Sequence, residues 1–318
     1  MEAENKAFLT SLGNRLKRFP QISIILALIV LFFLLTFISP NFFSASNMIN
    51  IIRQASTLLI LGAGITFILT VGGIDLSGGA VAGLSGMLTA SFLAQMNIPT
   101  VLGVFLGVLV GVAIGLINGL IISKVHIAPF IVTLATQTTA TGAMLIYCGG
   151  RAITGIPADA QFLGRGYVGF VPVPVIFMLF VLCTLWVILS STKFGRHIFA
   201  IGGNEECARL SGVKVDFTKT IVYAIGGACA ALSGIILTMR VASGQPTMGE
   251  GLELEAITAS VLGGTRMSGG KGYMLGTVLG CIFMTMLSNG LNIMGVSSFW
   301  KQVLTGFILV LAVVAYRK

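Results

Sequence analysis

A chain of 318 residues, 56% of them hydrophobic and only 9% charged, excludes an ordinary water-soluble domain, in which about a quarter of the residues carry charge. The net charge of +9 does not indicate nucleic-acid binding, because the basic residues lie at the edges of apolar runs, as they do in the loops of membrane proteins. The composition therefore predicts an all-α polytopic helical membrane protein whose outer surface contacts lipid.

The apolar runs set the number of membrane crossings, because a helix needs about 20 apolar residues to span the hydrocarbon core. A tenth run, 252–263, is short and carries Glu253 and Glu255 in its first turn, so it is either a short tilted span or a re-entrant hairpin. Counting it gives about ten transmembrane helices, with both termini on one side. The other nine runs, in chain order, centre on 22–39, 55–71, 80–95, 100–123, 128–147, 171–190, 220–240, 273–288 and 297–316.

The distribution of basic residues predicts that both termini are cytoplasmic (N-in/C-in). With this orientation 14 Lys and Arg fall on the inner face and 5 on the outer face, namely Arg53, Arg151, Arg165, Arg240 and Lys301. We expect a single transmembrane domain over residues 1–318, with a cytoplasmic leader at 1–20 and a cytoplasmic loop at 191–219. The first run could instead be a signal peptide, but its long polar leader favours an anchoring span.

One predicted span carries a glycine at every fourth position. On a helix these glycines form a groove without side chains, into which another helix can pack closely. We expect this groove to serve packing within the chain or, alternatively, a subunit interface, and we expect the helix to be central in the bundle. The glycines are Gly103, Gly107, Gly111, Gly115 and Gly119.

Two segments of the chain echo each other. Residues 71–79 (VGGIDLSGG) align with residues 262–270 (LGGTRMSGG) at one constant offset, which is consistent with a parallel internal repeat whose copies lie on the same membrane side. Asp75, two residues before Ser77, and Arg266 occupy equivalent positions with opposite charge. Because charges in a bundle pair or face a cavity, we hypothesise that these groups bracket the cytoplasmic end of a polar pathway.

Motifs of enzymes are incomplete in this chain. Gly83-Leu84-Ser85-Gly86 is similar to the surroundings of a serine nucleophile, but neither His126 nor His197 is at membrane depth to act as its base. The glycine-rich run ending at Lys271 is not a phosphate loop, because the spacing is one residue too long and Gly272 follows the lysine. The five cysteines form no C-x-x-C pair. The sequence therefore predicts no enzyme, no metal site and no cofactor on this chain.

The charged inner segment from Lys193 to Lys219 contains a short helix signal. Glu205 and Glu206 follow Asn204, a good N-cap residue, and Gly212 is a natural C-terminal stop. We expect a two-turn helix parallel to the membrane that exposes acidic and basic side chains to the cytoplasm.

This loop carries the clearest family resemblance. Glu206-Cys207-Ala208, then three residues, then Gly212, resembles the E-A-A-x-x-x-G signature by which permeases of ATP-binding-cassette (ABC) importers dock their ATPase subunits, with a cysteine in place of the first alanine. Residues 195–204 resemble the bacterial monosaccharide-permease branch, the ribose-type family, and residues 72–77 and 253–272 are similar to its two other hallmarks. Four positions depart from those hallmarks: Gly78 stands for Val, Arg266-Met267 for Ser-Leu and Glu255 for Asp.

The resemblance implies a homodimeric permease of the bacterial cytoplasmic (inner) membrane. It would take a monosaccharide, with ribose or a similar pentose preferred, from an extracytoplasmic sugar-binding protein, and a separate ABC ATPase subunit would drive it. A heterodimer with a paralogous permease is the alternative to the homodimer. The ATPase-coupling surface would be Asn204, Glu205, Glu206, Cys207, Ala208, Arg209, Leu210, Ser211 and Gly212.

Sugar hydroxyls need hydrogen-bond partners along the path. The candidates are Thr133, Gln137 and Thr141 in one span and Asn289 and Asn292 in another, although the threonines could instead bond to their own helix. The alternative to an ABC importer is an ion-coupled secondary sugar transporter, which should show ion-coupling acids within the membrane. Asp75 is the only acid within the first six spans, which weakens that alternative.

Overall fold

Helices form most of the computed structural model, which describes residues 20–315 of the chain. Six helices are long and apolar enough to cross a membrane. They are α3 (Ala45–Thr70), α5 (Thr100–Leu120) with its π-helical continuation η1 (Ile121–Val125), α6 (Pro129–Cys148), α8 (Val173–Ser191), α11 (Val215–Val241) and α13 (Met274–Ile293). Three shorter apolar helices, α2 (Pro20–Ile38), α4 (Gly78–Ala94) and α14 (Ser298–Ala315), and the 11-residue α12 (Leu252–Leu262) complete the set of apolar runs.

The predicted apolar runs coincide with helices, but one boundary differs clearly. The second run was expected to begin at residue 55, whereas α3 begins at Ala45. The additional N-terminal turns of α3 contain polar residues, so hydropathy alone does not assign them to the span. Ser44 is the N-cap of α3, because its hydroxyl accepts a hydrogen bond from the backbone N–H of Asn47.

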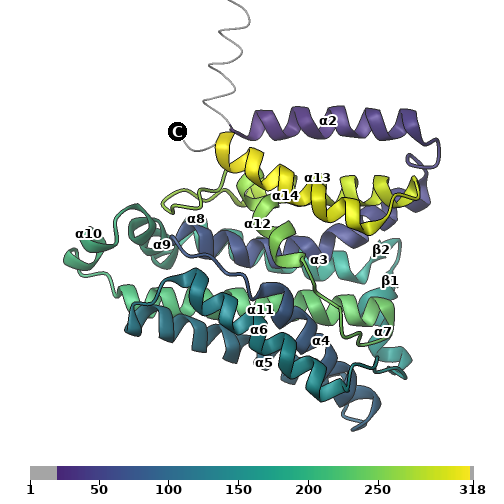
Figure 1. The fold of residues 1–318 in the computed structure, drawn as a ribbon, viewed down its shortest axis with the longest axis horizontal. Helices are drawn as coiled ribbons and strands as arrows, with labels where there is room; N and C mark the ends of the chain where they lie inside the picture. Colours follow the sequence, from purple (N-terminus) through teal and green to yellow (C-terminus); the bar gives the residue numbers. More distant parts are fainter. Residues whose placement is uncertain (1–19, 316–318) are drawn as a thin grey trace, which may run out of the picture.

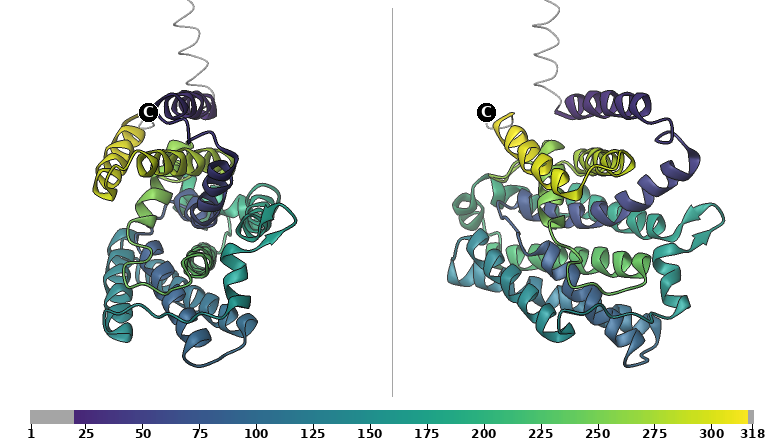
Figure 2. Two further views of the ribbon diagram at one scale, coloured as in Figure 1. Left: turned by 90° about the vertical axis from the view of Figure 1, so that its right-hand side faces the viewer. Right: turned by 45° about the vertical axis from the view of Figure 1, so that its right-hand side comes forward.

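The centre of the bundle is formed by α3 and α11. Within their most apolar 18-residue windows, 83% of the α3 residues and 72% of the α11 residues are buried. The end-on view in Figure 2 shows the other helices arranged around α11, with α2 and α14 on the outside. The expectation that the glycine-rich helix is central was wrong: only 22% of its window is buried, and Phe105 and Ile117 point outward.

The glycine groove of α5 receives α11 and α4 of the same chain. A Cβ atom on Gly111 would lie 2.3 Å from the carbonyl oxygen of Gly227, and one on Gly115 would lie 2.3 Å from that of Tyr223. Gly119 faces Thr220 in the same way. The other two glycines face α4: Gly107 meets Thr89 and Gly103 meets Leu93. The periodic glycines thus mark one contact face of a helix whose other faces are largely exposed in the single chain.

Two helices begin inside the bundle, after segments that enter it from an end. At about 1.5 Å per residue, the 11 residues of α12 extend about 16 Å, roughly half of a hydrocarbon core about 30 Å thick. The preceding segment, 242–251, lies against α4, because a Cβ on Gly249 would meet the Gly79 carbonyl oxygen at 2.2 Å. Gly244 pairs with Ile153 near α7, whereas Gly270, after α12, is hydrogen-bonded to Thr70 at the opposite end of the bundle (Figure 1). Residues 242–262 therefore run from one end to the other, which favours the short span over the re-entrant hairpin for 252–263. The turn 71–77 leads to the start of α4 in the same way, and Asp75 and Ser77 are buried.

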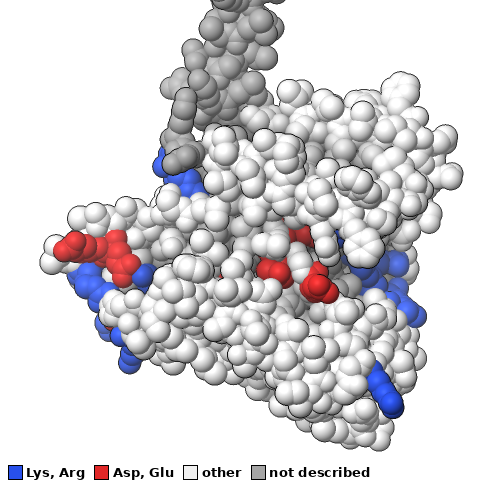
Figure 3. Space-filling view, viewed as in Figure 1, with Lys and Arg blue, Asp and Glu red and all other residues white. Residues whose placement is uncertain are grey.

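Charged residues gather at the two ends of the long axis, and a few acidic groups show near the centre of the face in Figure 3. One end carries α9 (Lys193–Gly203) and α10 (Glu205–Leu210) (Figure 1). The other carries α7 (Ala158–Arg165) and the hairpin of β1 (Tyr167–Val168) and β2 (Val171–Pro172), none of which the sequence predicted. Residues 1–19 of the predicted leader and residues 316–318, whose basic side chains contributed to the predicted orientation, lie outside the described residues.

We predict that Gly111→Ala destabilises the protein by about 1–3 kcal/mol, because the new methyl group overlaps the backbone of α11. The matched control is Gly306→Ala in α14, where nothing lies within 4 Å of the added Cβ. The midpoint of heat-induced loss of monodisperse protein in detergent measures the difference. Equal midpoints for the two variants would show that the α5–α11 contact is not close-packed.

Candidate functional site

The short helix expected in the charged loop is present as α10. Its first turn is capped by Asn204, whose Oδ1 accepts a hydrogen bond of 2.9 Å from the backbone N–H of Cys207. It ends before Gly212, which has a positive φ of 82°. Ala208 is buried beneath the helix, whereas the side chain of Leu210 is 84% exposed. The outer face of α10 therefore combines an acidic first turn with one exposed apolar residue.

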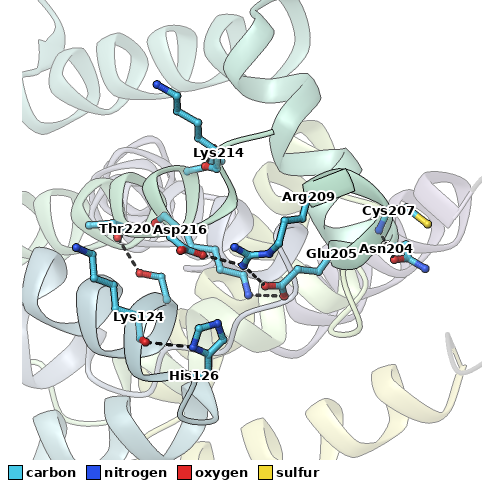
Figure 4. Close-up of polar contacts among 12 residues, drawn as sticks. Lys124, His126, Asn204, Glu205, Cys207, Arg209, Lys214, Asp216 and Thr220 are labelled. Carbon is cyan, nitrogen blue, oxygen red and sulfur yellow. Dashed lines mark hydrogen bonds and ion pairs between the residues drawn. The ribbon is translucent and has the colours of Figure 1, made fainter. Parts of the chain in front are cut away.

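Ion pairs attach α10 to the start of α11 (Figure 4). Arg209 pairs with Asp216 at 2.8 Å and with Glu205 at 3.5 Å, and Lys219 pairs with Glu205 at 2.5 Å. The hydrogen bond with Asp216 is the main cause that raises the pKa of Arg209, so the guanidinium stays charged. Exposed pairs of this kind contribute little to stability individually. Together they fix the direction in which α10 projects from the bundle.

Behind α10, three glycine-rich segments meet in a contact that we call the glycine junction: Thr70, Gly72, Gly202, Gly269 and Gly270. A Cβ on Gly202, at the end of α9, would lie 1.9 Å from the Thr70 carbonyl oxygen and 2.5 Å from the Gly270 nitrogen. That carbonyl accepts a hydrogen bond of 2.9 Å from the Gly270 N–H. Gly72 and Gly269, both with φ near +85°, pack against each other. The two echo segments, 71–79 and 262–270, therefore lie side by side at the end of the bundle that carries α10.

A chain of polar contacts continues from this junction into the bundle. The Oδ1 of Asp75 accepts hydrogen bonds from the Ser77 N–H at 2.8 Å and from the Ser77 hydroxyl at 2.5 Å. Asn118 donates to the Ser77 hydroxyl oxygen at 3.2 Å, and Thr133 accepts from the Leu76 N–H at 3.2 Å. Three of the predicted path residues, Asp75, Ser77 and Thr133, therefore lie together where α4 begins.

Arg266, which occupies the position equivalent to Asp75 in the second of the two aligned segments, lies in the turn between α12 and α13. Its backbone N–H donates to the Lys271 carbonyl oxygen at 3.0 Å, and its side chain is half-buried. The carboxylate of Asp75 accepts two hydrogen bonds from Ser77 in its own turn. Asp75 and Arg266 thus hold equivalent positions in two adjoining turns, and the role of either in a pathway stays a prediction.

Gln137 and Thr141 line a cavity of about 620 Å³ on the α6 side of the bundle. Facing them are Pro246, Thr247, Met248 and Glu250 of the segment 242–251 and Glu253 of α12. Gln137 Nε2 donates a hydrogen bond of 3.3 Å to Glu253 Oε1. The volume lies within the range of roughly 300–1,000 Å³ that is typical of small-molecule sites.

The asparagines of α13 are not part of this cavity. Asn289 is buried and forms a reciprocal pair of hydrogen bonds with Asn47 of α3, each 3.0 Å long, while Asn292 is exposed. The structure therefore separates the two groups of polar residues that the sequence proposed for one path. Asn289 fastens α13 to α3.

The sequence alone did not single out Gly202 or Glu253 as contact residues. Gly202 was part of a family-like motif, but its close approach to Thr70 depends on a contact between residues more than 100 positions apart. Glu253 was noted as an acidic residue near a helix start and as the first residue of a hallmark-like segment, but without a partner. A signal was present for Glu253, because an acid in an apolar run is costly to bury and is therefore a functional-site candidate.

Comparisons with known proteins point to one family. Residues 47–313 match the model described as "branched-chain amino acid transport system / permease component". A ribose import permease protein of Bacillus subtilis is 45% identical over 295 residues, which cover 92% of this chain and 91% of that protein. The ribose import permease protein of Escherichia coli K12 is 39% identical over 298 residues, 92% of each chain. A D-allose transport system permease protein of the same strain is 37% identical over 295 residues, 92% of this chain and 90% of that protein.

We predict that Asp75→Ala destabilises the protein by about 1–3 kcal/mol, because both hydrogen bonds from Ser77 lose their acceptor. Asp75→Asn keeps an oxygen at that position and should cost clearly less. Thermal midpoints of the purified variants in detergent measure both effects. If the alanine variant melts with the parent, the carboxylate does not hold the turn before α4.

Proposed function

The chain belongs to the "branched-chain amino acid transport system / permease component" family, in its ribose-type monosaccharide branch. We therefore propose that it is the membrane-spanning subunit of an ATP-driven sugar importer. It is an ABC-type sugar permease, a transport component of the bacterial inner membrane that crosses the bilayer several times. A separate ATPase subunit would supply the energy. An extracytoplasmic binding protein would deliver the sugar, and a second permease copy would complete the pathway.

The observation that carries this proposal is the surface of α10. Its acidic first turn and the exposed Leu210 project from the end of the bundle and are held in that direction by the ion pairs of Glu205 and Arg209. A rigid helix with an apolar residue ringed by charge suits a groove on a soluble partner, because the apolar contact gives affinity and the charges give orientation. We propose Asn204 to Gly212 as the ATPase-docking segment.

The glycine junction supports a route from the docked ATPase to the interior. Gly202 is the penultimate residue of α9, and only Asn204 separates α9 from α10, so a displacement of α10 would move the backbone that contacts Thr70 and Gly270. Thr70 is the last residue before the turn that leads to α4, and Gly270 lies in the turn that follows α12. We propose that ATP-dependent closure of the ATPase moves these turns together. For this to drive transport, the ATP-bound partner must bind one state of the permease more tightly than the other.

The proposed orientation has the α10 end in the cytoplasm, together with both termini. Gly202 brings α9 and both echo segments to one end, as N-in/C-in requires. Arg165 donates to the Arg240 carbonyl oxygen, and Arg53 contacts Tyr167, so three of the five residues assigned to the outer face gather near α7 and β1. Lys301, also assigned outside, instead pairs with Glu255 of α12 at 2.6 Å, so its charge is no guide to orientation.

For the substrate we propose a monosaccharide, with ribose or a similar pentose first. Two relatives named as ribose permeases are 45% and 39% identical to this chain, and the relative named as a D-allose permease is 37% identical. Because these sequence identities differ little, an aldohexose is the second candidate substrate. The family description refers to branched-chain amino acids, but the relatives compared here carry the names of sugar permeases.

We predict that Glu206→Arg lowers co-purification of the ATPase subunit at least tenfold in mild detergent, because charge reversal at an interface costs several kcal/mol. Glu206 is exposed, so the permease itself should stay folded. The matched control is Met96→Arg, which adds the same side chain at an exposed turn before α5, at the opposite end of that helix from η1.

Two results would contradict the importer. One is equal ATPase recovery with both variants. The other is sugar uptake by the purified permease alone in a pH or sodium gradient, which is the behaviour of the ion-coupled secondary transporter.

A second prediction concerns transmission and uses neighbouring glycines. Gly202→Ala should leave ATPase docking within about twofold but lower sugar uptake by the reconstituted importer at least tenfold, because the methyl group pushes α9 away from Thr70. Gly203→Ala is the control, since nothing lies within 4 Å of a Cβ at that position. Uptake that is unchanged in Gly202→Ala would show that the glycine junction does not carry the motion.

A further inference from the structure

We propose that Glu253 and Gln137 form a hydroxyl-binding site for the sugar in the cavity between α6 and the segment 242–251. This inference rests on the proposed function, because it concerns how that same permease handles its substrate. It adds a carboxylate contact to the pathway and gives Gln137 a specific partner. We call the cavity lined by Gln137, Thr141, Glu250 and Glu253 the acidic cavity.

The first observation is the burial of Glu253 without full hydrogen bonding. The residue is only 4% exposed, and its Oε2 is a buried oxygen with no hydrogen-bond partner. Its Oε1 accepts a single bond of 3.3 Å from the amide of Gln137. A buried carboxylate ordinarily uses several acceptor positions, because an unsatisfied polar oxygen is costly. Glu253 therefore has acceptor capacity that the described part of the protein leaves unused.

The second observation is the space made for this carboxylate. A Cβ on Gly79 would lie 2.0 Å from Glu253 Oε2, so only glycine at the second position of α4 accommodates the group. The start of α4 and the first turn of Glu253's own helix, α12, both present the positive ends of helix dipoles, which favour a negative charge. The fold thus keeps a carboxylate beside the cavity with no Lys or Arg among the cavity-lining residues.

A neighbouring acid shows the contrast. Glu255, two residues further along α12, is paired with Lys301 of α14 at 2.6 Å. An acid that serves packing alone is expected to have such a partner, because an unpaired charge in a bundle is expensive. Glu253 instead faces the amide of Gln137 and the cavity. The two acids of one helix turn therefore have different surroundings, and Glu253 is the one that could receive a ligand.

The lining chemistry fits a neutral polyol. Carboxylate oxygens accept hydrogen bonds from hydroxyl groups, the Gln137 amide both donates and accepts, and Thr141 adds a hydroxyl. Pro246 and Leu145 offer apolar surface for the C–H face of a sugar ring. An amino acid carries an ammonium group, which Glu250 and Glu253 would attract, and a carboxylate, for which the lining offers no cationic side chain. The acidic cavity therefore supplies partners for sugar hydroxyls but no cationic partner for the carboxylate of an amino acid.

Access of the carboxylate to a ligand needs only a side-chain rotation. The terminal torsion of Glu is broad, so either oxygen can turn toward the cavity while the helix stays in position. A hydroxyl that displaces the 3.3 Å bond from Gln137 would make a charge-assisted hydrogen bond, which is shorter and stronger than a neutral one. Binding and release would thus exchange one partner of Glu253 for another without leaving the carboxylate bare.

The test uses the complete importer in proteoliposomes: permease, ATPase and binding protein, with labelled ribose and, in parallel, labelled allose. Two rates are measured, ATP hydrolysis with the sugar-loaded binding protein and sugar uptake. Glu253→Gln keeps the size of the side chain and removes its charge, and Gln137→Ala removes the amide. Thr139→Ala is the control on α6, because its hydroxyl bonds to Ala135 of its own helix and lies outside the acidic cavity.

We expect Glu253→Gln and Gln137→Ala to lower sugar uptake per ATP hydrolysed at least tenfold, with ATP hydrolysis within about twofold of the parent and Thr139→Ala unchanged. Uptake per ATP within twofold of the parent in both variants overturns the proposal. A parallel fall of uptake and hydrolysis also overturns it, because that result indicates a structural role. If Glu253→Gln does not assemble with the ATPase, Gln137→Ala alone decides. Failure of the parent permease to bind the ATPase would instead contradict the proposed function.

Discussion

The contact on which the proposed mechanism depends is the close approach of Gly202 to the carbonyl oxygen of Thr70. No side chain fits there, since even a methyl group would lie 1.9 Å from that oxygen. The same oxygen is hydrogen-bonded to Gly270, so one carbonyl joins the end of α3, the end of α9 and the turn before α13. Packed backbone transmits displacement better than flexible side chains do, because it cannot relax by changing rotamer. A partner that moves α10 would therefore move the two turns around which the buried polar residues are arranged.

Those turns matter because of what begins beyond them. The helices α4 and α12 both start inside the bundle, with Asp75, Ser77 and Glu253 buried near their first residues. Polar groups in a membrane protein are tolerated where they satisfy one another or face a cavity. Asp75 accepts hydrogen bonds from Ser77 within its own turn, whereas Glu253 lines the acidic cavity and its Oε2, beside Gly79, has no hydrogen-bond partner among the described residues. One polar cluster thus maintains local structure, and the other has the capacity to bind a substrate that passes through the bundle.

Local features of the sequence predicted the local structure well. Apolar runs predicted the helices, and the residues Asn204 and Gly212 predicted the bounds of α10, because capping depends on neighbours in the chain. Long-range partners were not predictable in this way. The glycines of α5 indicated a close contact but not the exposure of the remaining faces, so the expected central position of that helix was wrong. Asn289 was proposed for the path, yet its partner is Asn47, 242 residues away. No periodicity or spacing connects Gly202 with Thr70, or Gln137 with Glu253.

The proposed docking of the ATPase on the cytoplasmic helix α10 is tested most directly through the native cysteine of this helix. Cys207 is exposed, and Cys183, also exposed, and Cys148 can be replaced by serine so that Cys207 is the accessible thiol among the described residues. Labelling with a membrane-impermeant maleimide is then compared between intact cells and inside-out vesicles, with and without the ATPase subunit. We expect labelling only in inside-out vesicles and protection by the bound ATPase. Labelling of Cys207 from outside intact cells, or labelling in vesicles that the ATPase leaves unchanged, would contradict it.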